Sequence, residues 1–213
     1  MASSTKPEFD LYQYEREAYC TGFLAVCGVD EAGRGPLAGP VYAAAVILPQ
    51  GLEIEGLNDS KKLSEKKRDE LYDIICAQAA AYCVASADER EIDKYNILQA
   101  TFLAMRRAVE GLGVAPDLVL VDGNQDPQLP CEHTLTIIKG DQRSASIAAA
   151  SILAKVSRDR YMLRLAQEYP QYELQKHKGY PTKAHYERLR QFGPAPIHRM
   201  SFLKKFFEGE KKG

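Results

Sequence analysis

Four acidic side chains stand where apolar, strand-like segments end. Asp30 and Glu31 follow an apolar segment at 23–29. Asp122 ends the next strong apolar run, and Asp141 comes shortly after a third. Strand ends can meet at one edge of a sheet, and carboxylates gathered there repel one another unless cations bind between them. Oxygen ligands with no His or Cys nearby favour hard ions such as Mg²⁺ or Mn²⁺ over zinc.

Each of these acids also has a purely structural interpretation. An Asp before Gly at a strand end is usually a turn residue or a helix N-cap. The pair Asp30 and Glu31 is harder to explain in this way. Neighbours in an extended strand point to opposite faces, so a bend is needed if both are to join one site. Gly33 and Gly35 stand where such a bend would need them.

The segment Gly33-Arg34-Gly35 has two interpretations that its spacing alone does not separate. Its backbone N–H groups could approach a phosphate or a sugar hydroxyl closely, because glycine has no Cβ. The alternative is a tight hairpin turn with an exposed arginine. The glycine spacing and the lysine of the dinucleotide and P-loop fingerprints are missing.

The net charge of −1 conceals an asymmetry along the chain. Residues 1–138 carry 12 basic and 22 acidic side chains, whereas residues 139–213 carry 16 basic and 7 acidic ones. A basic third favours contact with nucleic acid or another polyanion, although a charge run is more often a solvated face. Tyr180 lies within it and could stack on a base or sugar, or anchor a loop. The predicted basic face comprises Arg143, Lys155, Arg158, Arg160, Arg164, Lys176, His177, Lys178 and Lys183.

Composition excludes several classes of protein. The 213 residues are 45% hydrophobic and 27% charged, as is usual for soluble globular proteins. No run approaches the roughly 20 apolar residues that cross a bilayer, and the first twenty residues lack the apolar core of a secretory signal. Five cysteines without CxxC spacing indicate reduced thiols. A cytoplasmic protein is therefore expected.

The order of the predicted elements indicates an α/β protein. Apolar runs at 23–29 and 39–48, joined by a short link, predict an antiparallel hairpin. Further strands are expected at 82–87, 117–121 and 134–138, and helices at 64–80, 92–112 and 144–169. A mixed sheet flanked by helices follows. We expect one domain over 1–213, with about 1–20 as an N-terminal extension (a short helix or a loose segment) and about 170–213 as a basic C-terminal helical region.

Seven segments of this chain closely resemble bacterial ribonuclease HII, in the family's order. They are VDEAGRGPLAGPV at 29–41, DSKKLS at 59–64, NILQAT at 96–101, VDG at 121–123, KGD at 139–141, SIAAASILAKV at 146–156 and HKGYPT at 177–182. The resemblance implies a ribonuclease H-like mixed five-stranded sheet flanked by helices, with a C-terminal helical extension. It also implies an endonuclease that cuts the RNA strand of RNA–DNA hybrids and cuts 5′ of ribonucleotides embedded in duplex DNA. Only about 20 residues precede the first strand, which favours type II over type III.

The resemblance carries the catalytic and metal-binding roles to Asp30, Glu31, Asp122 and Asp141. Two divalent ions, Mn²⁺ or Mg²⁺, about 3.5–4 Å apart would bind the scissile phosphate from both sides. Asp30 matches the bridging ligand. Water attacks, so the products carry a 5′-phosphate and a 3′-hydroxyl.

The resemblance also assigns substrate contacts. Gly33, Arg34 and Gly35 match the turn that inspects the 2′-hydroxyl, the group that distinguishes RNA from DNA. Tyr180 matches a tyrosine that packs against the deoxyribose on the DNA side. The phosphate-contacting positions of the family fall on Lys61 and Asn96.

Three other hypotheses remain open at the level of sequence. A non-catalytic hybrid-binding module would need the basic region but no acidic cluster, and a metal-dependent phosphatase for small molecules would not need so extended a basic surface. Near the C-terminus, Met200, Leu203, Phe206 and Phe207 have the spacing of sliding-clamp-binding peptides, with Met200 in place of the usual Gln. The alternative for that segment is an amphipathic helix packed on a monomeric domain.

Overall fold

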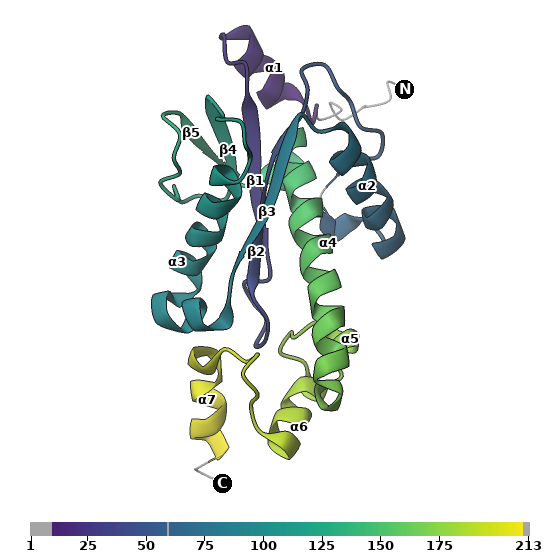
Figure 1. Cartoon of the computed structure of the whole chain (residues 1–213), viewed down its shortest axis with the longest axis vertical. Coiled ribbons are helices and arrows are strands. Elements are labelled where there is room, and N and C mark those ends of the chain that lie inside the picture. The colour runs from purple at the N-terminus through teal and green to yellow at the C-terminus, as the bar shows by residue number, and fades with distance from the viewer. Residues whose placement is uncertain (1–9, 59, 211–213) are drawn as a thin grey trace, which may run out of the picture.

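A computed structural model describes residues 10–58 and 60–210. A five-stranded sheet forms the centre of the molecule, with helices on both faces (Figure 1). The strands are β1 (Val26–Ala32), β2 (Val41–Ile47), β3 (Ala81–Ala87), β4 (Leu118–Asp122) and β5 (Thr134–Ile137). Their order is β3-β2-β1-β4-β5. The pairs β1–β2 and β2–β3 are antiparallel, whereas β1–β4 and β4–β5 are parallel. The predicted mixed five-stranded sheet is confirmed.

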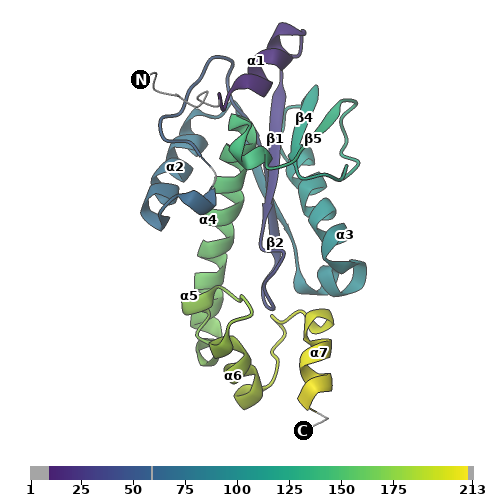
Figure 2. The ribbon, with the colours of Figure 1, turned by 180° about the vertical axis from the view of Figure 1, so that it is seen from behind.

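Helices cover the sheet and extend it at one end. They are α1 (Gln13–Cys20), α2 (Glu65–Gln78), α3 (Glu89–Glu110), α4 (Ala145–Glu168), α5 (Leu174–His177), α6 (Lys183–Phe192) and α7 (Met200–Glu210). Three short 3₁₀ turns lie between them: η1 (Ser60–Lys62), η2 (Gly140–Gln142) and η3 (Pro170–Tyr172). Seen from behind, α5, α6 and α7 lie beyond the turn of the β1–β2 hairpin (Figure 2).

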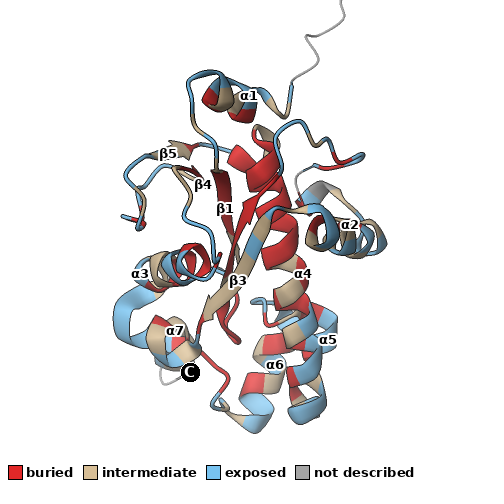
Figure 3. Cartoon of the chain, turned by 45° about the horizontal axis from the view of Figure 1, so that its top comes forward, coloured by how far each residue is buried: buried red, intermediate tan, exposed pale blue. Residues whose placement is uncertain are grey.

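Alternation along β1 divides the core into two layers. Cys27 and Val29 pack with Met105 and other residues of α3. On the opposite face, the first turns of α4 are buried on all sides from Ser144 to Ala154 (Figure 3). This part of α4 is rich in alanine, so the helix can lie close to the sheet while α2 packs on its other side.

The described parts of the N-terminal extension and of the C-terminal region, residues 10–20 and 170–210, pack against the rest of the fold. Residues Gln13–Cys20 form a short helix, one of the two forms expected for this segment, and it buries Ala18 against the sheet. A third apolar cluster joins Leu37 of the hairpin connection to Met162 of α4 and to Leu203 of α7. No helix in the described part of the chain combines the length and apolar character needed to cross a membrane.

Strand β1 runs three residues further than the sequence indicates. The apolar run suggests a strand that ends before Asp30, but pairing with β2 continues through Asp30 and Glu31, which stand opposite Ala44 and Ala43. Backbone pairing with a neighbouring strand, rather than side-chain polarity, sets where this central strand ends. The expected bend therefore comes after the acidic pair.

Candidate active site

Strand register brings Asp30 and Asp122 to the same level. Parallel strands β1 and β4 pair through Val29 and Val121, so the next residue of each strand is one of these aspartates. Asp30 is buried, with 3% of its surface exposed. The turn η2 follows β5 directly and carries Asp141, which is equally buried. Three of the four predicted acids thus belong to neighbouring chain segments at one level of the sheet.

A backbone hydrogen bond joins the Asp122 strand end to the turn that carries Asp141. The Gly140 N–H donates to Asp122 Oδ1 at 2.6 Å. A Cβ at position 140 would lie 2.6 Å from Ile147 Cδ1, so a side chain there would force Ile147 to shift where the turn approaches α4. The glycine before Asp141 therefore serves packing as well as the turn.

The charges of these acids affect one another. Burial raises the pKa of Asp30 well above its usual value, and the charges of Glu31, Asp122 and Asp141 raise it further. Burial also raises the pKa of Glu31, although Arg34 opposes that shift. Asp30 and Glu31 thus resist ionisation, and a divalent cation beside them would favour their charged forms.

The donor set fits hard cations, but the side chains do not form a finished ligand shell. All four predicted ligands offer oxygen, the donor that Mg²⁺ and Mn²⁺ prefer. Among the residues that the structure describes, no three His, Cys, Asp or Glu side chains already stand as a metal-binding group.

Two basic side chains lie against the acids. Lys61 Nζ is 3.3 Å from Asp141 Oδ2, and the lysine side chain is 76% exposed. Arg34 Nη1 is 3.3 Å from Glu31 Oε1. Lys61 and Arg34 were both expected to contact substrate, and the structure places each of them beside an acid of the site.

The Gly-Arg-Gly turn begins directly after β1. Gly33 has φ +97°, and a Cβ there would lie 2.1 Å from Arg158 Nε. Tyr180 lies beside this turn, because a Cβ at Gly35 would be 3.8 Å from Tyr180 Cε1. The Tyr180 side chain is 39% exposed, so part of its ring is free to meet a ligand. The structure thus brings together two segments that were predicted to contact substrate and that are about 145 residues apart in the sequence.

Two buried arginines hold this turn from within. Arg199 donates to the carbonyl oxygens of Gly33 at 2.6 Å, Arg34 at 2.9 Å and Gly39 at 2.8 Å. Arg158 donates to the carbonyl oxygens of Ala38, Pro40 and Lys178. Burial lowers the pKa of Arg199 to about 9 and also lowers that of Arg158.

The placement of Arg158 on the predicted basic face is wrong. Its side chain is completely buried. The spacing of Ala154, Arg158, Met162 and Leu165 puts the arginine on the apolar side of α4, which is the signal in the sequence that could have identified it. Arg199 has no comparable signal, because its partners lie about 160 residues away.

His177 is also buried rather than part of a basic face. It has 8% of its surface exposed, and its ring stacks on His185 with centroids 4.4 Å apart. The His185 and His198 Nε2 atoms are 3.1 Å apart. His185 Nδ1 lies 3.1 Å from the Tyr180 carbonyl oxygen, and the Tyr180 N–H donates to the His177 carbonyl oxygen. Burial lowers the pKa of His185 and His198 to about 4, so this trio is neutral and supports the Tyr180 loop.

Other members of the predicted basic face are engaged in ion pairs. Lys155 pairs with Asp159 at 2.8 Å, and Arg160 pairs with Asp69 at 2.9 Å. Lys176 lies 2.6 Å from Glu173. Part of the positive charge in this third of the chain is therefore locally balanced.

Asn96 interrupts α3 instead of standing among the acids. Its φ of 69° breaks the helix, and its side chain accepts the N–H groups of Leu98 and Gln99, as an N-cap does. Leu98 lines a small hollow that Glu31 and Asp122 also line. The exposed Asn96 is thus at the edge of the acidic site.

The strand order, the parallel central pair and the acids at its end define a ribonuclease H-like nuclease. Solved structures agree: ribonuclease H2 from Pyrococcus horikoshii has a TM-score of 0.69 and 30% identity, covering 83% of this chain and 93% of that one. A mutant form of Bst-RNase HIII has a TM-score of 0.68 and 20% identity, covering 91% and 70%, and shows the same fold.

Sequence comparison narrows the class. The Ribonuclease HII family model matches residues 27–205. Ribonuclease HII from Caldicellulosiruptor bescii is 54% identical over 193 residues, which cover 91% of this chain and 93% of that protein. Ribonuclease HII 1 from Methylibium petroleiphilum is 59% identical over 175 residues, covering 82% and 88%. The chain belongs to the ribonuclease HII family and is a metal-dependent endoribonuclease.

Proposed function

We propose that this endonuclease hydrolyses the RNA strand of RNA–DNA hybrids and cuts 5′ of single ribonucleotides in duplex DNA, leaving a 5′-phosphate and a 3′-hydroxyl. The observation that carries the proposal is the position of the Gly33–Gly35 turn. This turn directly follows the strand that carries Asp30 and Glu31, and it contacts Tyr180. A group that recognises a ribose and groups that can cleave a phosphate are thus adjacent.

We assign Asp30, Glu31, Asp122 and Asp141 as the metal ligands, with Asp30 as the bridging one. The burial of Asp30 and Asp141, and the repulsion that Glu31, Asp122 and Asp141 exert on Asp30, support this assignment. A related fold, Bst-RNase HIII, has been solved in complex with Mn²⁺. When bound, two Mn²⁺ or Mg²⁺ ions supply an activated water and stabilise the leaving oxygen. Asp122, held by the Gly140 N–H, keeps one free carboxylate oxygen for this task.

The Gly-Arg-Gly turn is the proposed sensor of the 2′-hydroxyl. Arg199 binds the carbonyl oxygens of Gly33 and Arg34 from inside the protein. In a trans peptide the next N–H points the opposite way, so the N–H groups of Arg34 and Gly35 face away from Arg199. These two donors can meet a ribose hydroxyl, and Tyr180 packs against the neighbouring deoxyribose.

Lys61 and Asn96 are the proposed phosphate contacts. Lys61 is exposed and stands beside Asp141, where a phosphate next to the cleaved bond would pass. Asn96 is exposed and accepts the N–H of Leu98, a residue that lines the same hollow as Glu31 and Asp122. This connection to the hollow supports a phosphate contact by Asn96.

The proposed catalytic unit is one ribonuclease H-like domain over residues 1–213, acting as a monomer in the cytoplasm. Contacts of α7 with α4 and the hairpin connection support a single unit. No observation favours a non-catalytic hybrid-binding module or a small-molecule phosphatase over the nuclease.

A sliding clamp is a second proposed partner. Ribonuclease HII of Archaeoglobus fulgidus, 25% identical with a TM-score of 0.66, has been solved as a complex with PCNA. In this chain Met200 is exposed, but Leu203 is fully buried, and Phe206 stacks on Tyr186. Clamp binding through this segment therefore requires release of α7, and a pull-down of clamp by the full chain, compared with Phe206→Ala, tests it.

The decisive experiment is cleavage of a DNA duplex that contains one ribonucleotide, with and without divalent metal. We expect one cut on the 5′ side of the ribonucleotide, complete suppression by EDTA, and no cut in the all-DNA duplex. Cleavage that survives EDTA, or that ignores the ribonucleotide, would contradict the proposal.

A further inference from the structure

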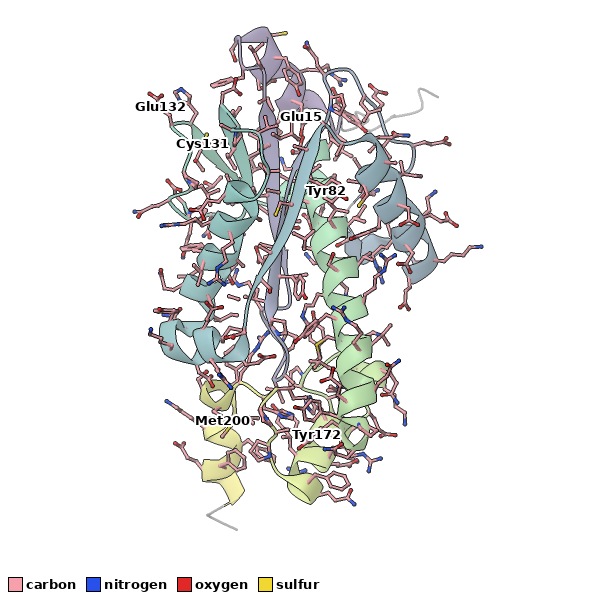
Figure 4. The ribbon with its side chains drawn as sticks, in the orientation of Figure 1. Glu15, Tyr82, Cys131, Glu132, Tyr172 and Met200 are labelled. Carbon is pink, nitrogen blue, oxygen red and sulfur yellow. The ribbon has the colours of Figure 1, made fainter. Side chains whose placement is uncertain are left out.

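A buried carboxylate on α1 contacts the helix that follows Asp141. Glu15 is 4% exposed, although its neighbours Arg16 and Glu17 are exposed. Figure 4 places it at the α1 end of the molecule, opposite Tyr172 and Met200. It also precedes residue 27, where the family match begins. An ionised carboxylate in such a position is costly unless its bonds compensate for the lost hydration.

One oxygen, Oε1, makes such bonds with the first turn of α4, whereas Oε2 is buried without a hydrogen-bond partner in the described part of the chain. Glu15 Oε1 accepts the hydroxyl hydrogen of Ser144 at 2.6 Å and the N–H of Ser146 at 2.9 Å. Ser144 is the N-cap of α4 and accepts the N–H of Ile147. The first turn of α4 contains no acidic residue. Glu15 therefore supplies, from another helix, the negative charge that a helix N-terminus favours.

The same serine is bonded to the turn that carries Asp141. The N–H groups of Arg143 and Ser144 both donate to the Gly140 carbonyl oxygen at 2.9 Å. The Gly140 N–H in turn donates to Asp122 Oδ1. A chain of hydrogen bonds thus runs from Glu15 through Ser144 and Gly140 to Asp122, and Asp141 lies inside it.

A second contact from α1 reaches this turn. The Arg143 guanidinium lies 5.4 Å from the centre of the Tyr14 ring. Tyr14 and Glu15 are consecutive in α1, so one helix contacts Arg143 and Ser144, two of the three residues that connect Asp141 to α4.

We propose that Glu15 is a positioning residue for Asp141: it fixes the N-terminus of α4 and so the turn from which Asp141 meets divalent metal. This inference rests on the proposed metal-binding role of the four acids. Because Glu15 acts through the backbone of the turn, its loss raises the Kd for divalent metal. A substitution of equal cost to the Tm elsewhere in the fold leaves that Kd unchanged.

Mn²⁺ binding in the absence of substrate tests this role. We expect Glu15→Ala to raise the Kd for Mn²⁺, measured by titration calorimetry, about three- to tenfold, less than the roughly 10- to 100-fold typical of a group bonded directly to a metal ligand. The Mn²⁺ concentration for half-maximal cleavage rises in parallel. Glu15→Gln keeps an oxygen acceptor but loses the charge, so its effect is intermediate, and it carries the test if Glu15→Ala does not fold.

The control is Asp117→Ala. The Asp117 carboxylate also accepts two backbone N–H groups, from Leu24 and Ala25, but it has no bond to the Asp141 turn. We expect it to lower the Tm and to leave the Kd for Mn²⁺ within about twofold. Equal changes of Kd in the Glu15 and Asp117 variants, at equal loss of Tm, would reduce Glu15 to a structural cap.

Asp141→Asn separates the two levels of the proposal. If Asp141→Asn binds Mn²⁺ and cleaves like the wild type, the proposed metal-binding role of Asp141 is wrong. If Asp141→Asn loses both properties while Glu15→Ala leaves the Kd unchanged, only the role of Glu15 is wrong.

Discussion

The Gly140 N–H donates a 2.6 Å hydrogen bond to Asp122 Oδ1. This bond joins the end of β4 to η2, so the positions of Asp122 and Asp141 depend on each other. Asp122 Oδ1 holds the turn through this bond, and the proposed metal-binding role falls to the charge of the carboxylate and to its second oxygen. A substitution can therefore separate the two roles.

Asp122→Asn is expected to abolish cleavage while preserving the fold. The amide oxygen of asparagine can still accept the Gly140 N–H, but the negative charge is gone. We expect the cleavage rate to fall by roughly 100- to 1000-fold or more, as when a single electrostatic group is removed from a catalytic site. The measurement is single-turnover cleavage of the duplex with one ribonucleotide, together with duplex binding by fluorescence anisotropy. Wild-type turnover in this variant would remove Asp122 from the catalytic set.

The strands could be predicted because most of them are apolar runs between turn residues. The end of β1 could not, since Asp30 and Glu31 read as a turn until Ala44 and Ala43 of β2 are seen to pair with them. The strand propensity of a segment depends on its own residues, whereas the length of β1 depends on backbone pairing with β2, which the sequence of β1 does not reveal.

The sequence predicted which residues form the site, but not the buried residues that hold those segments in place. The quoted motifs contain all four acids and the Gly-Arg-Gly turn, and the register of β1 and β4 puts Asp30 beside Asp122. Glu15 and its partner Ser144 are 129 residues apart, and no local pattern links them. The charge of Arg158 suggests an exposed side chain, and only its position on the apolar side of α4 indicates that it is buried.

Tyr180→Ala is expected to affect the two substrate types unequally. A single embedded ribonucleotide presents one RNA–DNA junction, and Tyr180 beside Gly35 is placed to contact its DNA side. A base or sugar stacked on an aromatic ring gains about 1–3 kcal/mol, so we expect roughly 10- to 100-fold slower cleavage of that substrate and a smaller loss on a long hybrid. Tyr180→Phe keeps the ring and serves as the control. Equal, unchanged rates on both substrates would exclude junction contact by Tyr180.

Arg199→Lys is expected to destabilise the protein although it keeps the charge. A lysine cannot reach the carbonyl oxygens of Gly33, Arg34 and Gly39 together, and a buried acceptor left without a partner costs about 1–3 kcal/mol. We expect the free energy of unfolding in urea to fall by about 2–4 kcal/mol. Arg160→Lys is the matched control, because its ion pair with Asp69 is exposed and contributes about 1 kcal/mol or less. Equal losses of unfolding free energy in the two variants would argue against a stabilising role for the Arg199 hydrogen bonds to the turn.

The contribution of His185 and His198 to stability is expected to fall as the pH decreases from about 6.5 to about 4, because both rings are neutral in the fold. Burial lowers the pKa of each to about 4, from an ordinary value of 6.5. Below pH 6.5 the unfolded chain binds protons that the folded chain does not, so unfolding becomes easier, and above 6.5 this effect vanishes. Each histidine contributes a slope of up to about 1.4 kcal/mol per pH unit. Urea unfolding at pH 7.5, 6.0 and 4.5 measures the slope, and NMR titration of the two imidazoles checks its origin. Protonation of both rings near pH 6.5 in the folded protein would show that the trio does not hold the Tyr180 loop as neutral side chains.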